Sequence, residues 1–320
     1  MRNIPLTALL LAASCTLASS AFSETTASPA DSTSAKQDKN KSYFFSSLLP
    51  KALQAHPLLT ISVITEVTDL GKKITPPTAN KPAYYLIKSM GYHHEGQGVY
   101  EEGKVAIENI ERIVRNSLAS SHYLPADKEH PATLCLFYFW GIHSKLDNPD
   151  QETGMGGTPD IGYKNLLARA QLVGGAKFAK EFEAALKSKH DSMSPGDNKM
   201  IGIDPVYMFT MRTDLNRSLM DQVLDDCYYV VVSAYDAGAL VGKGERKLLW
   251  RTKISTAAQG VSIAETTPTL VTSGGAFFGR DMKEAMLVDK RINRKGSVET
   301  GELKVLEMDG KSETTPPANK

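Results

Sequence analysis

Apolar residues recur along this chain with two different periods, and the order of these periods limits the folds that it can form. From Leu59 to Val67 they fall mostly at every second position, which predicts a strand with one buried face. Within 102–120 they are spaced three and four residues apart, which predicts a helix with an apolar stripe. The same patterns predict strands at 83–90, 134–140, 227–235, 247–255 and 285–288, and helices at 161–188, from Pro205 behind the capping Asp204, and from Ser262, which forms a capping box with Glu265.

The predicted strand at 247–255 indicates how the layers stack. Lys247, Arg251 and Lys253 alternate with apolar residues there, so we expect one face of this strand to meet water. A sheet with one solvated face carries helices on its other side only. We therefore expect an α+β fold, a two-layer sandwich of a mixed, mostly antiparallel sheet with helices packed on one face. The strands 227–235 and 247–255 are expected to form an antiparallel hairpin around a glycine-rich turn at Gly238–Gly244.

The first 23 residues have the features of an export signal. Arg2 precedes the apolar run Leu6–Leu11, which is too short to span a bilayer, and the small residues Ala21 and Ser23 suit cleavage before Glu24. We therefore expect an exported protein, periplasmic or extracellular.

A second way of ending the signal leads to membrane attachment. Ala12-Ala13-Ser14-Cys15 resembles the lipobox of bacterial lipoproteins, in which Cys15 would be acylated, although the usual leucine is displaced by one position to Leu11. The sequence leaves both outcomes open, a free exported protein or one with a lipid anchor at Cys15.

Four segments are expected along the chain: a signal peptide at 1–23, a disordered Ser/Thr-rich linker at 24–42, a single α/β domain at 43–289 and a disordered polar tail at 290–320. The chain has 37 Lys and Arg residues against 36 Asp and Glu. Removal of Arg2 with the signal would leave a formally neutral protein, so we expect no nucleic-acid partner. No apolar run after the signal is long enough to predict a transmembrane helix in the mature chain.

Two cysteines remain after the predicted signal. Cys135 and Cys227 lie in or next to apolar runs that we interpret as core strands. They would form a disulfide if their strands were neighbours and their Cα atoms close enough; otherwise they would be two unpaired buried thiols.

The sequence contains none of the motifs that usually mark catalysis or cofactor binding. It lacks a GxSxG elbow, an HExxH pair, a GxGxxG turn and a phosphate-binding loop. We therefore assign no catalytic residue, metal ligand set or cofactor from the sequence.

Three short segments are candidates for a binding site. His93 and His94 are adjacent, but neighbours on a strand point to opposite faces and do not easily share a metal. Trp140 and His143 lie at the end of a predicted central strand, where open sheets often bind ligands, and a glycine-rich loop at 144–160 follows them. Trp250 and Arg251 would offer a ring and a guanidinium to a carboxylate or sugar ligand, although alternation places them on opposite faces.

The stretch Asp226-Cys-Tyr-Tyr-Val-Val-Val-Ser-Ala-Tyr-Asp236, with Lys247-Leu-Leu-Trp-Arg251 and the helix after Ser262, resembles uncharacterised exported bacterial proteins of no assigned function. More loosely, it is similar to the α/β modules of envelope lipoproteins, namely the amino-terminal domain of TolB and the curli-secretion lipoprotein. The resemblance implies a scaffold or assembly role and transfers no catalytic residue.

Two functions therefore stand as hypotheses. The first is a non-enzymatic binding or assembly module of the cell envelope, whose partner is an envelope protein or a cell-surface polymer. The alternative is a hydrolase or metal-dependent enzyme that uses His143 with His93 or His94 under the glycine-rich loop.

Overall fold

The computed structural model describes residues 49–96, 107–145, 159–192 and 203–294. The predicted signal with Cys15, the linker 24–42 and most of the loop 144–160 lie outside the described residues, as does the tail from 295. Contacts divide the chain into 1–44 and 45–320, and every described residue belongs to the second unit.

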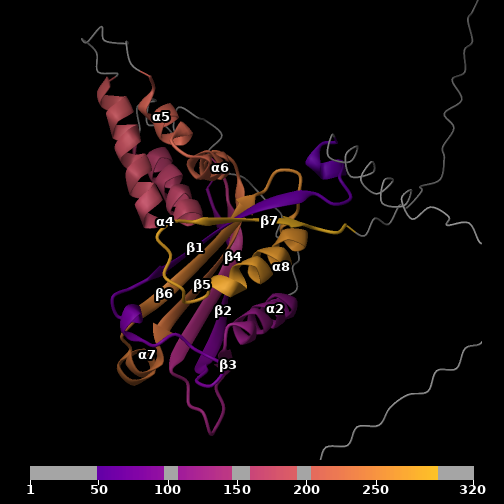
Figure 1. Ribbon diagram of the computed structural model, residues 1–320, viewed down its shortest axis with the longest axis vertical. Helices are drawn as coiled ribbons and strands as arrows, with labels where there is room; N and C mark the ends of the chain where they lie inside the picture. The colour runs from indigo at the N-terminus through magenta and orange to yellow at the C-terminus, as the bar shows by residue number, and fades with distance from the viewer. Residues whose placement is uncertain (1–48, 97–106, 146–158, 193–202, 295–320) are drawn as a thin grey trace, which may run out of the picture. The chain divides into compact units, whose positions relative to one another are not determined.

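One mixed sheet of seven strands organises this unit (Figure 1). The strand order is β3-β2-β4-β5-β6-β1-β7. Strand β2 pairs in parallel with β3 and β4, and the other neighbours pair antiparallel. The bounds are β1 Leu58–Val67, β2 Ala83–Glu95, β3 Tyr123–Pro125, β4 Leu134–His143, β5 Cys227–Asp236, β6 Leu248–Ala257 and β7 Met286–Arg291.

Helix α2 (Ile107–Ser120) lies between β2 and β3 in the chain and provides the crossover that the parallel pair β2–β4 requires. Its predicted stripe is confirmed, because Ile110, Val114 and Leu118 are all fully buried. Helix α8 (Ile263–Gly274) packs beside α2, and its capping box between Ser262 and Glu265 forms as predicted. Pro268 lies inside this helix and does not end it.

Both helices cover one face of the sheet, which we call the core face. The core face is formed by alternate residues of the strands, and the largest cluster of buried apolar side chains lies there, including Leu59, Ile61, Val63, Tyr138, Trp140, Val230, Val232, Trp250 and Ile254. Strand alternation therefore fixes which side chains are left for the opposite face.

The opposite face carries helices too, at one end of the sheet. Helix α4 (Pro159–Ser192) contacts β1 and β6, and it packs with α5 (Pro205–Met211) and α6 (Asp214–Val223) around a second apolar cluster that contains Ile64, Phe178 and Phe182. In Figure 1 these three helices gather at the upper end of the strands. The α+β class and the mixed, mostly antiparallel sheet are confirmed, but the helices are not confined to one face.

The physical reason for this difference is that two polar residues of this face, Ser62 and Lys253, find hydrogen-bond partners within the protein. Ser62 donates a hydrogen bond to the Val173 carbonyl at 2.7 Å, and Lys253 donates to the Glu66 carboxylate at 2.8 Å and to the Gln171 carbonyl at 3.0 Å. Both donors are buried. Because these bonds satisfy the polar groups, a face that looks solvated in the sequence is covered by a helix.

Helix α4 is broken at Gly175, where φ is 82° and ψ is −179°. A Cβ atom at this position would lie 2.9 Å from Cγ1 of Ile64 on β1. The glycine therefore permits both the left-handed backbone and the close approach to the sheet. Phe178, Phe182 and Leu186, spaced four residues apart in the predicted helix 161–188, are buried in its second half.

Two segments differ from the predicted elements. The helix expected after Asp204 is capped there as predicted, but it ends at Met211, and α6 starts anew behind the N-cap Thr213. The glycine-rich segment between β5 and β6 is helix α7 (Ala237–Lys243), whose first turn is capped by Asp236 and which ends at the left-handed Gly244. Local capping explains both differences: Thr213 starts a new helix, and Asp236 and Gly244 delimit α7. The apolar pattern does not show where a helix begins or ends.

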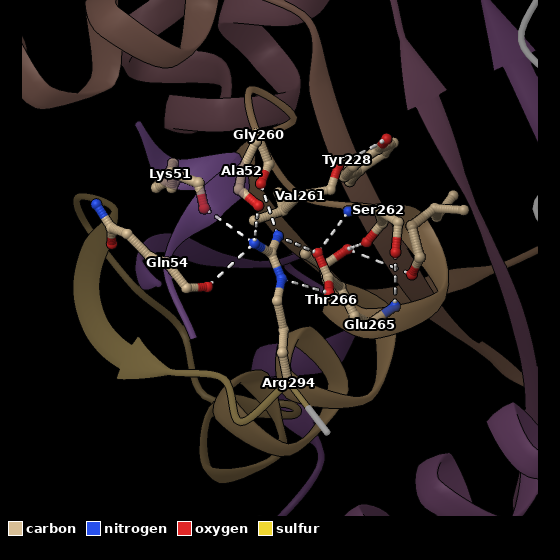
Figure 2. A network of polar contacts seen from close by, with 11 residues as sticks. Lys51, Ala52, Gln54, Tyr228, Gly260, Val261, Ser262, Glu265, Thr266 and Arg294 are labelled. Carbon is tan, nitrogen blue, oxygen red and sulfur yellow. Dashed lines mark hydrogen bonds and ion pairs between the residues drawn. The ribbon is translucent and has the colours of Figure 1, made fainter. Parts of the chain in front are cut away.

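The described residues extend beyond the domain boundary expected at residue 289. Strand β7 ends at Arg291, Ile292 is buried, and Arg294 lies at the centre of a polar network that Figure 2 shows. The Arg294 guanidinium donates hydrogen bonds to the backbone carbonyls of Lys51, Ala52, Gln54 and Gly260, in addition to the Glu265 carboxylate. The network holds the segment before β1, the start of α8 and the segment after β7 together.

Candidate functional site

The six candidate residues divide between the two faces of the sheet. Trp140 and Trp250 belong to the cluster on the core face and are almost fully buried, so they are structural. The opposite face carries His93, His143 and Arg251. Their partners on the neighbouring strands, Gly141, Cys227 and Ser233 in the same order, lie on this face too. Alternation therefore separates Trp250 from Arg251 as expected.

His93 and His94 point to opposite faces, in agreement with the sequence argument. The His93 ring lies 4.9 Å from the Phe139 ring, whereas His94 Nε2 is 3.3 Å from Ser144 Oγ. Within the described residues, no group of three or more His, Cys, Asp and Glu side chains is arranged to hold a metal ion. The histidines of the enzyme hypothesis thus do not converge on one described ligand set.

Two cavities open on the part of the opposite face that lies away from α5 and α6. The first, which we call the aromatic cavity, has a volume of about 230 Å³ and is lined by Met90, His93, Phe137, Phe139, Ser233, Tyr235, Leu240, Arg246 and Arg251. The second, which we call the histidine cavity, has a volume of about 240 Å³ and is lined by Glu95, Phe139, His143, Ala168, Gln171, Leu172, Tyr229, Val231, Arg251 and Lys253.

The sheet places aromatic rings in the wall of the aromatic cavity. Phe137 and Phe139 are two positions apart on β4 and therefore share a face, and Tyr235 lies on the neighbouring β5. The Phe137 and Tyr235 rings meet edge to face, with centroids 5.6 Å apart. These rings were not selected from the sequence, because 134–140 was interpreted only as a central strand.

Arg251 stands in the wall of both cavities and is held in place by its neighbours on β5. Its Nε donates a hydrogen bond to Ser233 Oγ at 3.0 Å, and Nη2 lies 3.5 Å from the Tyr235 hydroxyl. A guanidinium has five N–H donors, so these two contacts leave three for other acceptors. Arg251 is only half-buried, and a ligand in either cavity reaches it.

Lys253, the next residue on that face of β6, has its charge compensated within the protein. Burial raises the pKa of Glu66, but the hydrogen bond and charge of Lys253 outweigh this effect and lower it. Burial also lowers the pKa of Lys253, which Glu66 opposes. The pair therefore closes one side of the histidine cavity without leaving an unbalanced charge there.

His143 is buried in the histidine cavity, and its Nδ1 lies 3.4 Å from Oε2 of Glu95 on β2. Burial and the charge of the nearby Arg169 lower the pKa of His143 to about 4, although a hydrogen bond with Asn165 acts in the other direction. The imidazole is therefore neutral at pH 7.

Tyr229 adds a polar group that the sequence analysis did not select. It is 2% exposed, and its hydroxyl is buried without a hydrogen-bond partner among the described residues. Burial, followed by the charge of Glu95, raises the pKa of this phenol.

The two cysteines occupy neighbouring strands but do not pair. Cys135 lies opposite Tyr235 and Cys227 opposite His143, at the two ends of the β4–β5 ladder, and both thiols are free and buried. Burial raises the pKa of Cys227 to about 12, so its thiol stays protonated. They do not form a disulfide, because Cys227 lies opposite His143, which is eight positions along β4 from Cys135.

A further cavity between α4 and α6, of about 130 Å³, is smaller. Four of its charged residues form two ion pairs, Lys177 with Glu284 and Arg212 with Glu181, and Lys283 lines it as well. A larger cavity of about 420 Å³ lies beside α7 and contains none of the candidate residues. We take the aromatic and histidine cavities as the candidate site because His93, His143 and Arg251 line them. None of the described helices combines the length and the apolar composition that crossing a bilayer requires.

Comparison with known proteins does not assign a family. No family model and no curated protein matches the chain. Among solved structures, a PDZ domain protein from Parabacteroides distasonis is similar with a TM-score of 0.33 and 12% identity over 79% of this chain, which spans 42% of that protein. PelC from Paraburkholderia phytofirmans, solved as a dodecamer, gives a TM-score of 0.26 and 8% identity over 68% of this chain and 95% of PelC.

A DUF4136 family protein from Bacteroides thetaiotaomicron gives a TM-score of 0.26 and 11% identity over 68% of this chain and 93% of that protein. At these scores the likenesses assign neither a fold family nor a function. The resemblance to TolB and the curli-secretion lipoprotein stays a prediction.

Proposed function

We propose that this chain is an exported cell-envelope protein that binds an anionic ligand on the open part of its sheet and does not transform it. The observation that carries the proposal is the composition of the aromatic cavity. Two guanidiniums, Arg246 and Arg251, stand beside three aromatic rings, and none of the described residues that line the cavity is Asp or Glu.

Such a wall favours an anion attached to an apolar or flat group. A guanidinium is planar and binds carboxylate or phosphate oxygens through two parallel N–H bonds, and its attraction to an anion grows in apolar surroundings. Because Ser233 already orients Arg251, little side-chain entropy is lost on binding. The partner would be an acidic part of an envelope protein or a cell-surface polymer, which suits a scaffold or assembly role.

The cellular location rests on the sequence. The first 23 residues have the arrangement of an export signal, and the ligands that we propose belong to the periplasm or the cell surface. Attachment to the membrane through an acylated Cys15 is the alternative to release, and mass spectrometry of the protein from intact cells distinguishes the two.

The binding proposal can be tested with a probe that combines aromatic rings and a sulfonate. Anilinonaphthalene sulfonate should show a saturable rise in fluorescence with the wild-type chain, and Arg246→Gln and Arg251→Gln should each weaken it. Arg217→Gln, which alters an exposed residue of α6, is the matched control and should bind as the wild type does. Equal affinity in all four proteins would contradict the proposal.

A second candidate function, hydrolysis, has one observation in its favour. His143 lies in a cavity wall, is neutral at pH 7 and contacts Glu95, so it can accept a proton, but its lowered pKa of about 4 makes it a weak base. The hydrolysis of an activated ester such as p-nitrophenyl acetate by the wild type and by His143→Gln tests it. Equal rates in the two proteins would exclude His143 as a base in this reaction.

A further inference from the structure

We propose that the end of the sheet that carries α7 docks on an anionic phospholipid surface. This inference goes beyond the proposed function, because the side chains concerned line neither the aromatic nor the histidine cavity. Two segments form the docking surface, the loop 70–82 after β1 and the segment 237–247, which contains α7. We call it the lysine surface and define it by Leu70, Lys73, Ile74, Val241, Lys243 and Lys247.

Strand pairing brings the two segments to the same end of the sheet. Strand β1 runs antiparallel to β6, so the last residue of β1, Val67, lies opposite Trp250 near the start of β6. Just beyond β1, the backbone of Thr68 donates a hydrogen bond to the Leu249 carbonyl at 2.9 Å. The loop 70–82 therefore begins beside α7, which precedes β6 and lies at the lower end of the strands in Figure 1. The cavity of about 420 Å³ is lined by both segments.

The lysine surface exposes aliphatic side chains to water. Leu70 and Ile74, on either side of the short 3-10 helix η2 (Gly71–Lys73), are each 45% exposed, and Val241 of α7 is 73% exposed. Single exposed apolar residues are common on proteins, but these three are grouped on the turns at one end of the sheet. Their transfer from water into an apolar phase would be favourable.

The same surface has an excess of basic residues. The segments 70–82 and 237–247 contain six Lys and Arg residues and one acidic residue, Glu245. Among the described residues, Lys247 pairs with Glu245 at 2.8 Å, whereas Lys73 and Lys243 form no ion pair. Three acidic residues beside the segments reduce the net charge to +2, namely Asp69, Asp236 and Asp281.

The chemistry of this surface favours a lipid over a protein partner. Protein interfaces are enriched in aromatic residues and arginine and depleted of lysine. None of the described residues that line the cavity is aromatic or Arg, whereas three are Lys and three are Leu or Ile. A phospholipid surface offers phosphates to lysines and, beneath them, acyl chains to aliphatic residues. If Cys15 is acylated, the lysine surface adds the second contact that stable attachment requires.

The experiment reports which part of the full chain meets a vesicle. Val241→Trp places an indole on the lysine surface, whereas the native Trp140 and Trp250 are buried. With vesicles of phosphatidylcholine and phosphatidylglycerol, the fluorescence of the added indole should shift to the blue, because its ring leaves water. Vesicles of phosphatidylcholine alone should bind at least tenfold more weakly, since they carry no net charge. Met208→Trp, at an exposed position of α5, is the matched control and should not shift.

Two further substitutions test the role of charge. Lys73→Gln and Lys243→Gln, each introduced into the Val241→Trp chain, should weaken vesicle binding about fivefold, the usual effect of one lysine near an anionic surface. Arg217→Gln in the same chain should leave the affinity unchanged. All three side chains are exposed, so the substitutions should not disturb the fold.

The other outcomes overturn the proposal. A blue shift in both tryptophan variants, or in neither, would show that the lysine surface is not where the protein meets lipid. Binding through residues 1–23 would not separate the two variants, because both contain them. Equal binding to both kinds of vesicle would exclude the lysines. Displacement by equimolar glycerol phosphate or oligoglutamate would assign the lysines to a small anion or to an acidic protein.

Discussion

Arg294 binds both carboxylate oxygens of Glu265, with Nη2 2.7 Å from Oε1 and Nε 3.0 Å from Oε2. Glu265 in turn accepts a hydrogen bond from the backbone of Ser262 at the start of α8, so one carboxylate both caps the helix and holds the chain beyond β7 (Figure 2). The hydrogen bond from Arg294 lowers the pKa of Glu265, and burial opposes this effect to a smaller extent. The pair thus stays ionised and connects residues that are far apart in the sequence.

Removing the Arg294 side chain should destabilise the protein. Arg294→Ala leaves four backbone carbonyls and Glu265 without this donor, so we expect the free energy of unfolding in urea to fall by about 2–4 kcal/mol. Arg294→Lys should recover only part of the loss, because an ammonium lacks the planar fork. Arg217→Ala, an exposed control, should stay within about 0.5 kcal/mol of the wild type. If Arg294→Lys were as stable as the wild type, the positive charge alone, and not the planar guanidinium, would account for the stabilisation.

Tyr229→Phe should leave the stability unchanged or raise it. The variant removes a buried hydroxyl that has no described partner, and an unsatisfied buried polar group costs about 1–3 kcal/mol. The neighbouring Tyr228→Phe is the control, since the Tyr228 hydroxyl donates to the Val261 carbonyl at 3.3 Å, and its loss should cost about 0.5–1.5 kcal/mol. Thermal unfolding of both variants compares their stabilities with that of the wild type. A clear destabilisation by Tyr229→Phe would contradict the prediction.

Stability should fall in mild acid because of His143. Its folded pKa of about 4 lies below the unfolded value near 6.5, so the unfolded chain takes up a proton at a higher pH. The stabilisation is complete above about pH 6.5 and is lost as the pH falls toward 4, by roughly 3 kcal/mol in total. Glu95 from β2 and Arg169 from α4 both face the ring.

Denaturant unfolding between pH 4 and 7 checks this dependence. His143→Gln should flatten the curve, whereas His190→Gln, which alters an exposed histidine, should not. If His143→Gln keeps the slope of the wild type in this range, other groups are responsible.

Gly141→Ala should disturb both the fold and the site. A Cβ at Gly141 would overlap the His93 carbonyl on the paired strand β2, so we expect a loss of about 1–3 kcal/mol and weaker ligand binding beside Phe139. Gly242→Ala is the matched control, because it lies in α7 with open space around its Cβ position and should gain up to about 1 kcal/mol. In calorimetry, the unfolding temperature should therefore fall for Gly141→Ala and rise for Gly242→Ala.

Much of the fold was predictable because its signals are local. Alternation at Leu59–Val67, the stripe Ile110–Val114–Leu118 and the capping box at Ser262 each depend on residues a few positions apart. The separation of Trp250 from Arg251, and of His93 from His94, follows from strand geometry in the same way. The end of α5 at Met211 and the whole of helix α7 were missed, since capping overrides the apolar pattern there.

The sequence by itself determined most of the element types, the mixed sheet and the faces on which the candidate side chains lie, but it did not predict β3 or α7. Only the tertiary structure decided that α4 covers Ser62 and Lys253, because polar residues can be buried when distant partners such as Val173 and Glu66 satisfy them. It likewise decided that Arg251 shares a cavity with Phe137 and Tyr235. That site is built from strands brought together by long-range pairing, which short-range periodicity does not encode.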